Sequence, residues 1–435
     1  MRDLLLVAVF PILLYFIFKR PYVGVSLWMW SAMFFPNGWV WGFASSLRYN
    51  LLIALATILS YVFQKDKIKT ERSGLTILIL FFFIWTTISS AFTISNPDVV
   101  WFEWGVFFKI IIFYIFCILT IKTKHHVNVF LWAITLSAAY FGAAEGLKYI
   151  ITAGGHVVEG IPGSRLRDRN ELALAVNMTI PLIIFLLSQT KNKWLRLALI
   201  GAVFFNIVAI VGSFSRGGLL GLIVIGGYFF LQSKRKFLVS AVLIISVGVG
   251  SAFVTDKWTN RMDSINTMEQ DSSFLGRVVA WKQSVLMAAD HPIFGGGFKA
   301  GQNPAVWFLY ADEFDSLDFI IDTSHYVVVY PKAAHSIYFQ VLGDQGFVGL
   351  LIFLSILIMT YRKFVWVTKN SSDEWLIGLA RMLKVSLVAY CAGGAALSLP
   401  YFDFSFALFA LASILIEIVQ REKTGTINKR IAIRE

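Results

Sequence analysis

Residues 194–231 read WLRLALIGAVFFNIVAIVGSFSRGGLLGLIVIGGYFFL, two long apolar runs joined by the polar and glycine-rich turn Ser213–Gly218. A helix that crosses the hydrocarbon core of a bilayer needs about 20 predominantly apolar residues, and each run is of that order. The stretch therefore predicts two membrane helices. The turn between them places Arg216 at the membrane surface.

The same apolar character extends over the whole chain. Of its 435 residues, 57% are hydrophobic and 15% are charged, and the mean hydropathy is +0.70. A soluble protein of this length cannot bury so much apolar surface. A single apolar run would also suit a buried core helix, but a dozen such runs predict an all-α polytopic membrane protein.

Reading runs of membrane-spanning length along the chain predicts 12 or 13 transmembrane helices. The total depends on the first two runs, which are short and separated by Lys19-Arg20-Pro21, and which form either two spans or one broken hairpin. The runs are 4–18, 22–41, 48–63, 74–92, 104–120, 127–150, 171–188, 194–212, 217–231, 236–254, 336–360, 377–397 and 401–419.

Lysine and arginine are distributed unevenly between the connections. Basic connections alternate with connections poor in lysine, which predicts that the basic ones face the cytoplasm. The net charge of +12 comes largely from these loops, so we expect no nucleic-acid partner. The basic connections are Gln64–Ser73, Lys122–His126, Gln189–Arg196, Lys234–Lys236 and Tyr361–Asp373, and the opposite face receives Thr93–Glu103, Thr152–Asn170, Ser213–Gly218, Thr255–His335 and Leu399–Phe402.

These patterns predict five regions. They are an N-terminal transmembrane region (1–190), central helices that carry the Ser-Arg-Gly-Gly turn (191–254), an outer loop (255–335), C-terminal transmembrane helices (336–420) and a basic cytoplasmic tail (421–435).

The outer loop is much longer than a routine connection, and loops of this length are usually functional. It is acidic, with ten Asp and Glu against six Lys and Arg. Within it, Phe274–Met287 has apolar residues at helical spacing, preceded by Asp271-Ser272-Ser273 and followed by Asp290-His291-Pro292. We expect a helix that lies along the membrane surface and covers a cavity, followed by a turn at Gly295-Gly296-Gly297.

Three outer-face residues are the predicted catalytic set. Arg216 is either an interfacial arginine that snorkels to the surface or an anion ligand, because a helix N-terminus and a guanidinium both favour phosphate. Arg277 is either a solvated residue of the loop helix or a second cation for the same anion. His335 either caps a helix or acts as a general base that activates or orients an acceptor, since histidine titrates near neutral pH.

A second group of residues surrounds this set and is predicted to bind substrate. Arg169 and Asn170 rank above Arg165 and Arg167 because they lie nearest the membrane, although a solvated basic loop explains them equally well. Glu171 is explained by the helix dipole alone. The predicted substrate-binding residues are Arg169, Asn170, Ser215, Trp281, Ser336 and Tyr338.

No metal or cofactor is expected. Cys117 and Cys391 both lie in apolar runs and do not indicate a disulfide or a zinc site. The outer face has no Asp-x-Asp motif and no pair of carboxylates at glycosidase-like positions. Gly295-Gly296-Gly297 is not followed by the Lys and Ser or Thr of a phosphate-binding loop.

Three motifs together resemble the O-antigen ligase and polymerase superfamily of bacterial envelope proteins. They are Ser215-Arg216-Gly217-Gly218, the Gly276–Gly295 stretch with Arg277, Trp281 and Asp290-His291-Pro292-Ile293-Phe294, and Ala334–Gly349 (AHSIYFQVLGDQGFVG), which is the most specific. With Met1-Arg2-Asp3 and Arg20–Gly24, the chain most resembles the O-glycosylation ligase associated with exosortase A systems. Relatives tend to carry Asp-Asn-Asn where this chain has Asp168-Arg169-Asn170.

The resemblance implies a metal-independent, inverting glycosyltransferase with a GT-C-like fold in the bacterial inner membrane, whose active site faces the periplasm. The donor would be a glycan on undecaprenyl diphosphate, and the acceptor a lipid A core, a protein or a saccharide, with membrane lipids around the protein. By position, Arg216 and Arg277 would hold the diphosphate and His335 would activate or orient the acceptor hydroxyl.

Two other functions suit the same residues. A polymerase would use the same donor on the same face but extend the glycan. A transporter for a lipid-linked saccharide would also line a cavity with cations, although the chain shows no inverted repeat of the kind that many transporters have.

Overall fold

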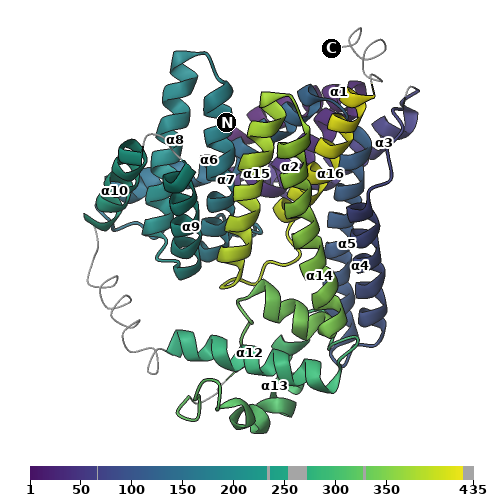
Figure 1. Cartoon of the computed structure of the whole chain (residues 1–435), viewed down its shortest axis with the longest axis vertical. Coiled ribbons are helices and arrows are strands. Elements are labelled where there is room, and N and C mark those ends of the chain that lie inside the picture. The colour runs from purple at the N-terminus through teal and green to yellow at the C-terminus, as the bar shows by residue number, and fades with distance from the viewer. Residues whose placement is uncertain (66, 233–235, 253–271, 327–329, 425–435) are drawn as a thin grey trace.

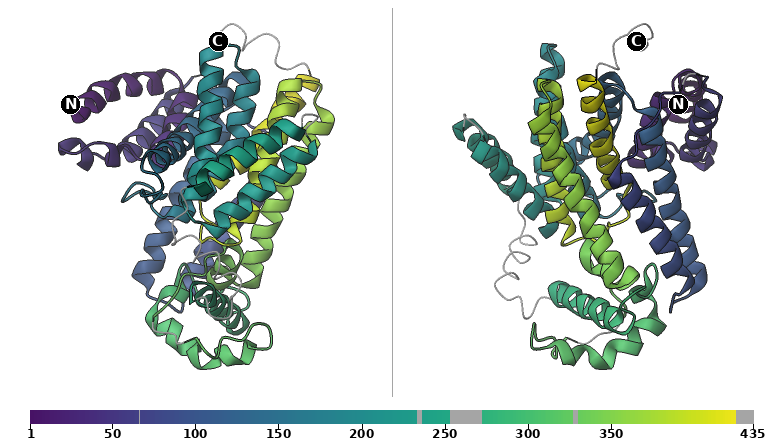
Figure 2. Two further views of the ribbon diagram at one scale, coloured as in Figure 1. Left: turned by 90° about the vertical axis from the view of Figure 1, so that its left-hand side faces the viewer. Right: turned by 45° about the vertical axis from the view of Figure 1, so that its right-hand side comes forward.

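The computed structural model describes residues 1–65, 67–232, 236–252, 272–326 and 330–424, and no β-strand occurs among them. An α-helix lies at each of the thirteen predicted apolar runs (Figures 1 and 2). These helices are α1 (Arg2–Lys19), α2 (Pro21–Phe34), α3 (Tyr49–Phe63), α4 (Gly74–Ala91), α5 (Pro97–Thr120), α6 (Lys124–Ile151), α7 (Arg169–Gln189), α8 (Lys193–Gly212), α9 (Arg216–Gln232), α10 (Lys236–Ala252), α14 (Ile337–Asn370), α15 (Glu374–Gly394) and α16 (Asp403–Lys423). The predicted all-α polytopic membrane fold is confirmed.

Eight of these helices are long and apolar enough to cross a membrane: α4 to α8 and α14 to α16. The other five, α1, α2, α3, α9 and α10, have 14 to 18 residues, at or below the short end of the usual range for a span. The total of 12 or 13 spans therefore stays a prediction for those five helices. Lys19-Arg20-Pro21 does separate two helices, with Pro21 as the first residue of α2.

Three predicted boundaries were wrong. Helix α14 ends at Asn370 rather than near residue 360, so most of the predicted basic connection Tyr361–Asp373 is helical. Helix α2 ends at Phe34 rather than near residue 41, because Phe35 has a left-handed conformation (φ 50°) and Pro36 follows it. Helix α5 begins at Pro97 rather than at residue 104, because the Asn96 side chain caps it by accepting from the Asp98 N–H. Glu103, predicted to lie in a loop, is therefore on a helix.

Several predicted features lie partly or wholly outside the described residues. They are residues 253–254 of the predicted run 236–254, residues 255–271 and 327–329 of the outer loop, with Asp271 of the predicted helix cap, residue 66 and residues 234–235 of two basic loops, and residues 425–435 of the tail.

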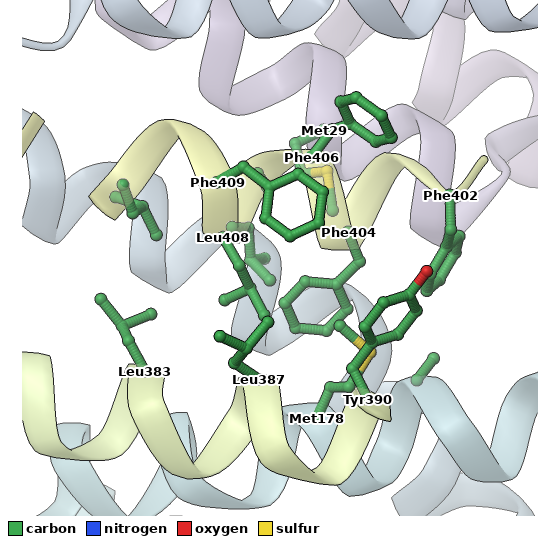
Figure 3. Packing of buried hydrophobic residues seen from close by; sticks show 14 of the residues in the cluster. Met29, Met178, Leu383, Leu387, Tyr390, Phe402, Phe404, Phe406, Leu408 and Phe409 are labelled. Atoms are coloured by element: carbon green, nitrogen blue, oxygen red, sulfur yellow. The ribbon is translucent and has the colours of Figure 1, made fainter. Parts of the chain in front are cut away.

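Helices α7 and α16 form the centre of the bundle, and most of their membrane-spanning residues are buried. Helix α16 packs against α4, α5, α14 and α15, and α7 packs against α6, α8, α9 and α15. Figure 3 shows how Phe404 and Leu408 of α16 meet Leu387 and Tyr390 of α15, with Met178 of α7 close by. Because lipid tails are as apolar as these side chains, close van der Waals packing rather than removal from water holds such helices together.

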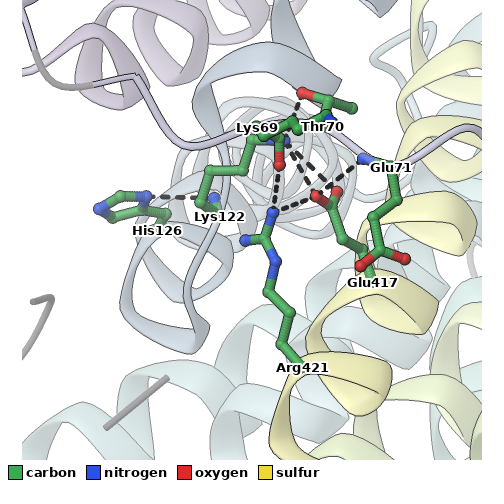
Figure 4. A network of polar contacts seen from close by, with 7 residues as sticks. All are labelled: Lys69, Thr70, Glu71, Lys122, His126, Glu417 and Arg421. Carbon is green, nitrogen blue, oxygen red and sulfur yellow. Dashed lines mark hydrogen bonds and ion pairs between the residues drawn. The ribbon is translucent and has the colours of Figure 1, made fainter. Parts of the chain in front are cut away.

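One end of the bundle is held by a buried cluster of charges (Figure 4). Glu417 of α16 pairs with Arg421 one turn later and with Lys122 of the α5–α6 connection, whose Nζ lies 3.3 Å from the carboxylate. Lys122 also donates to Thr70 Oγ1 (2.7 Å), and Arg421 donates to the Lys69 carbonyl. Three of the predicted basic segments therefore meet at one end of the protein.

Replacing Glu417 with alanine is expected to lower the free energy of unfolding by about 3–5 kcal/mol, because two buried cations lose their partner. Glu422→Ala is a matched control: Glu422 pairs with Lys124 at 3.4 Å, but its side chain is 31% exposed, and exposed pairs contribute about 0–1 kcal/mol. Thermal unfolding of both variants in detergent measures the difference. Equal losses would contradict this account.

The opposite end carries a small lobe, residues 272–326, built on α12 (Ser272–Asp290) and α13 (Pro304–Tyr310), with 3₁₀ helices η4 (Ala300–Gln302) and η5 (Ala311–Leu317). Helix α12 confirms the helix predicted at 274–287. It packs on α14 and runs across the end of the bundle (Figure 1). The lobe has its own core, which includes Val279, Met287, Trp307 and Phe314. Lys282 of α12 pairs with Asp318, and this bond lowers the pKa of Asp318.

A break in α14 fastens the lobe to the bundle. Gly346 interrupts the helix with φ 70°, which frees backbone groups around it. The segment that follows α12 bonds to these groups: Gly296 N–H donates to the Gly343 carbonyl (2.8 Å), Gly297 N–H to the Asp344 carbonyl (2.9 Å), and Phe347 N–H to the Pro292 carbonyl (2.9 Å). The break therefore serves as the docking point of the lobe.

Gly346→Ala is expected to destabilise this junction by roughly 1–3 kcal/mol or more. An added Cβ would lie 2.6 Å from the Ile293 carbonyl oxygen, and a positive φ disfavours any other residue. Gly227→Ala in α9 is the control, because its Cβ would meet nothing within 4 Å. Proteolysis of the lobe and thermal unfolding measure the effect, and a Gly346→Ala protein as resistant as Gly227→Ala would contradict it.

Candidate functional site

A cavity of about 310 Å³ lies where the lobe meets the bundle. Its wall comes from five parts of the chain that are distant in sequence: α5, the α6–α7 connection with the start of α7, the segment before η4, the start of α14, and the α15–α16 connection. The charged and polar residues of the wall are Glu103, Arg165, Asp168, Glu171, Lys299, Gln302, His335, Gln340, Ser398 and Tyr401.

His335 is the predicted catalytic residue that lines this cavity. It has a left-handed backbone (φ 43°), and its N–H donates to Ser398 Oγ at 2.8 Å. Ser336 follows it and caps α14 by accepting from the Phe339 N–H. A non-glycine residue held in this strained conformation costs about 1–3 kcal/mol and is typical of functional sites.

The surroundings of His335 lower the pKa of its imidazole. Burial is the largest cause, the positive charge of Arg277 adds to it, and the negative charge of Asp168 opposes it. The imidazole is therefore neutral at neutral pH and can accept a proton. Because the charges of Arg277 and Asp168 both act on the imidazole, both residues lie near His335.

Trp281 explains how Arg277 reaches this place. The Trp281 indole N–H donates to the Ala334 carbonyl (2.7 Å), and its ring stacks on Phe339 at 5.0 Å between centroids. Arg277 lies one turn earlier on the same face of α12. Helix α12 is thus fixed against the chain on both sides of His335, and this brings Arg277 to the histidine.

Arg216 begins α9, in the turn that follows Phe214 (φ 53°). Ser215 Oγ accepts from the Gly218 N–H at 3.0 Å and so caps the helix. The glycines allow close packing: a Cβ on Gly218 would lie 2.7 Å from Ala173 of α7, and one on Gly217 would lie 3.1 Å from the Gly393 carbonyl of α15.

The short stretch Gly393–Ser398 therefore contacts both parts of the predicted set. Gly217 at the start of α9 packs against Gly393, and His335 donates to Ser398. Among the described residues, however, the cavity wall includes neither Arg216 nor Arg277. Arg277 lies near His335, which lines the cavity, and Arg216 begins a helix whose next residue, Gly217, packs against Gly393 and Ala396.

The six predicted substrate-binding residues are also absent from the described part of the wall. Ser215, Trp281 and Ser336 make the contacts given above, and the Tyr338 hydroxyl donates to the Cys391 carbonyl (2.9 Å). Asn170 bonds to Asp168 Oδ1 through its backbone and its side chain. Arg169 is the first residue of α7. Trp281 and Tyr338 therefore connect separate elements, whereas the bonds of Ser215, Ser336 and Asn170 are local to a helix start.

Arg165, Asp168 and Glu171 line the cavity in place of Arg169 and Asn170. Asp168 caps α7, and Glu171 follows three residues later, so both lie on one face of its first turn. The spacing of Asp168 and Glu171 was visible in the sequence. Glu171 was nevertheless explained by the helix dipole alone and was not predicted to line a site. Arg165 carried no signal that set it apart from Arg167.

Lys299 and Glu103 were also missed. Lys299 has a left-handed backbone (φ 55°), its N–H donates to Asp344 Oδ1 (2.9 Å), and its Nζ lies 2.7 Å from Glu103 Oε1. Asp344 is buried in α14, nine residues after His335. The sequence did contain a signal for Glu103, which is a carboxylate next to a long apolar run. Carboxylates are costly inside a membrane, so such a residue is a candidate for a functional site.

With this geometry in view, the known families can be compared. Residues 201–354 match the family model described as O-antigen ligase, and residues 1–191 match a model described as a family of unknown function, DUF5935. No curated protein matches the chain. Over residues 201–354 the chain is similar to O-antigen ligases.

Arg216, Arg277 and His335 all lie in the segment that matches O-antigen ligases. The match supports the O-antigen ligase superfamily and a glycosyl-transferring enzyme of the ligase or polymerase type, with a lipid-linked glycan and an acceptor as partners. With the eight apolar helices, it supports a multi-pass membrane protein.

The pKa of His335 is expected to lie below about 6.5, the ordinary value for histidine. Asp168→Asn should lower it further, because a negative charge is lost while asparagine still caps α7. Arg277→Gln should raise it. NMR titration of ring-labelled histidine in detergent, with His335→Asn to assign the signal, measures these pKa values. A pKa of 6.5 or more, or a rise in Asp168→Asn, would contradict the electrostatic account.

Proposed function

We propose that this chain is an inverting, metal-independent glycosyltransferase that moves a glycan from undecaprenyl diphosphate to an acceptor hydroxyl on a lipid A core, a protein or a saccharide. The site would face the periplasm from the bacterial inner membrane. The observation that carries the proposal is His335 in the wall of a cavity, beside Arg277, within the segment similar to O-antigen ligases.

The chemistry follows from the charges of the site. The acceptor oxygen attacks the anomeric carbon opposite the diphosphate, a new C–O bond forms, and the bond to the diphosphate oxygen breaks. The hydroxyl proton passes to the neutral imidazole of His335. A general base of this kind contributes about 10²–10⁴-fold to the rate.

Negative charge grows on the diphosphate as it leaves. Arg277 beside His335, and Arg216 with the N–H groups at the start of α9, would hold that charge. Each well-placed donor of this type contributes about 3–4 kcal/mol to the stability of a transition state. A guanidinium suits a diphosphate because its parallel N–H groups match two phosphate oxygens.

Arg216→Ala is expected to lower glycan transfer about 10²–10³-fold, and His335→Ala about 10²–10⁴-fold. The assay follows transfer from an undecaprenyl-diphosphate glycan at matched protein levels. Arg167→Ala, an exposed arginine outside the cavity wall, should keep wild-type activity. Wild-type rates in both Arg216→Ala and His335→Ala would overturn the proposal.

The product separates the ligase from its alternatives. Glycan joined to a different acceptor supports the ligase. A ladder of repeats that grows on undecaprenyl diphosphate would instead identify a polymerase. Lipid-linked glycan that crosses liposomes containing the protein, without any covalent product, would identify a transporter.

A further inference from the structure

Two cations, Arg381 and Lys384, lie one turn apart in the first half of α15, away from the cavity that adjoins its other end. Lys384 Nζ lies 5.9 Å from the ring centroids of both Tyr228 of α9 and Tyr361 of α14, which is within the range of a cation–π interaction. Arg381 is close enough to Tyr228 for its charge to act on the phenol. These four residues therefore lie together, and we name them the Lys384 patch.

The described residues give this patch a net positive charge. Among them, neither Arg381 nor Lys384 forms an ion pair with a carboxylate. Asp373 pairs instead with Lys124, and Glu374 lies two turns before Arg381, about 10 Å along the helix. An anion at the membrane surface is therefore the occupant that complements the patch.

Helix α15 is exposed along one narrow stripe. Of its residues, only Glu374, Arg381 and Val388 are exposed, and they lie seven positions apart, which places them on one face. Val388 is 36% exposed, and on the neighbouring α14 Ile358 is 59% exposed, one turn from Tyr361. The surface thus passes from charged to apolar beside the patch, so its occupant has an anionic head and an apolar tail.

The patch lies where the apolar stretches of these helices end. On α14, Tyr361-Arg362-Lys363 follows the apolar stretch Phe347–Thr360, and on α9, Tyr228 lies one turn before the end at Gln232. Tyrosine together with lysine or arginine is typical of the headgroup level of a membrane. Tyr228 is twelve residues from Arg216, about 18 Å along α9, so the patch is separate from the predicted catalytic set.

We propose that the Lys384 patch binds the phosphate headgroup of an anionic phospholipid, whose acyl chains lie along Ile358 and Val388. The planar guanidinium of Arg381 matches two phosphate oxygens, and Lys384 supplies a point charge held between two rings. The site lies on the side of the membrane that carries the basic connections, predicted to be the cytoplasm. It is independent of the proposed glycan transfer. Because the lipid contacts α9, α14 and α15 together, it stabilises their packing.

Lipid binding to the full-length protein in detergent tests this proposal. The probes are phosphatidylglycerol and phosphatidylcholine with the same acyl chains, and native mass spectrometry gives the Kd of each complex. Phosphatidylglycerol is expected to bind at least about tenfold more tightly, and to raise the unfolding temperature, because its net negative charge meets two cations. Glycerol 3-phosphate, a headgroup without acyl chains, should not displace it.

Variants assign the binding to the patch. Arg381→Met with Lys384→Met should weaken phosphatidylglycerol binding about thirtyfold, which corresponds to about 1 kcal/mol for each cation, and leave phosphatidylcholine binding unchanged. Lys191→Met with Lys193→Met is the matched control, since it removes two exposed cations from a basic connection on the same predicted side. The control should stay within about twofold of the wild type, because exposed charges far from the site are screened.

Single variants provide a second test that changes the protein less. Arg381→Gln, at an exposed position, should weaken phosphatidylglycerol binding about fivefold. Tyr361→Leu should weaken it about threefold, whereas Tyr361→Phe should not, because only leucine removes a ring from Lys384. Unfolding temperatures in lipid-free detergent show which variants are folded.

Four results would overturn the inference. Equal affinities for the two lipids would remove the role of charge, and equal losses in the Arg381/Lys384 and Lys191/Lys193 variants would indicate general attraction to a basic surface. Displacement by glycerol 3-phosphate would indicate a site for free phosphate. Tighter binding of undecaprenyl phosphate at the same residues would assign the patch to the glycan carrier.

Discussion

The break in α14 at Gly346 is the constraint on which the rest of the site depends. A helix interrupted inside a membrane protein must have its freed N–H and carbonyl groups satisfied, because lipid offers no hydrogen bonds. Here the segment between α12 and η4 supplies them through Gly296, Gly297 and Pro292. The need to satisfy the backbone thus joins the lobe to the bundle, and the cavity lies at that junction.

Two groups that line the cavity, Lys299 and His335, lie next to this junction or to the start of α14. Asp344, two residues before the break, accepts from the Lys299 N–H and holds Lys299 in a left-handed conformation. His335 lies just before the first turn of α14, and its backbone N–H donates a hydrogen bond to Ser398 Oγ. A rigid frame of this kind matters for catalysis, because groups that are already placed need no reorganisation during the reaction.

Charges of both signs surround His335. The cavity that it lines is also lined by Glu103, Arg165, Asp168, Glu171 and Lys299, and Arg277 lies close enough to act on its imidazole. The pKa of His335 is lowered because burial and the positive charge of Arg277 outweigh the negative charge of Asp168.

The amino-acid sequence by itself determined the membrane class, the positions of all thirteen apolar helices and the helix of the outer loop, because these follow from local hydrophobicity and spacing. It also singled out His335, whose motif is contiguous. It did not reveal that Trp281 and Tyr338 donate hydrogen bonds to the carbonyls of Ala334 and Cys391. Nor did it reveal that Glu103, Arg165 and Lys299 line the same cavity. Those facts depend on contacts between segments up to 196 residues apart, and only the tertiary packing decides which side chains meet.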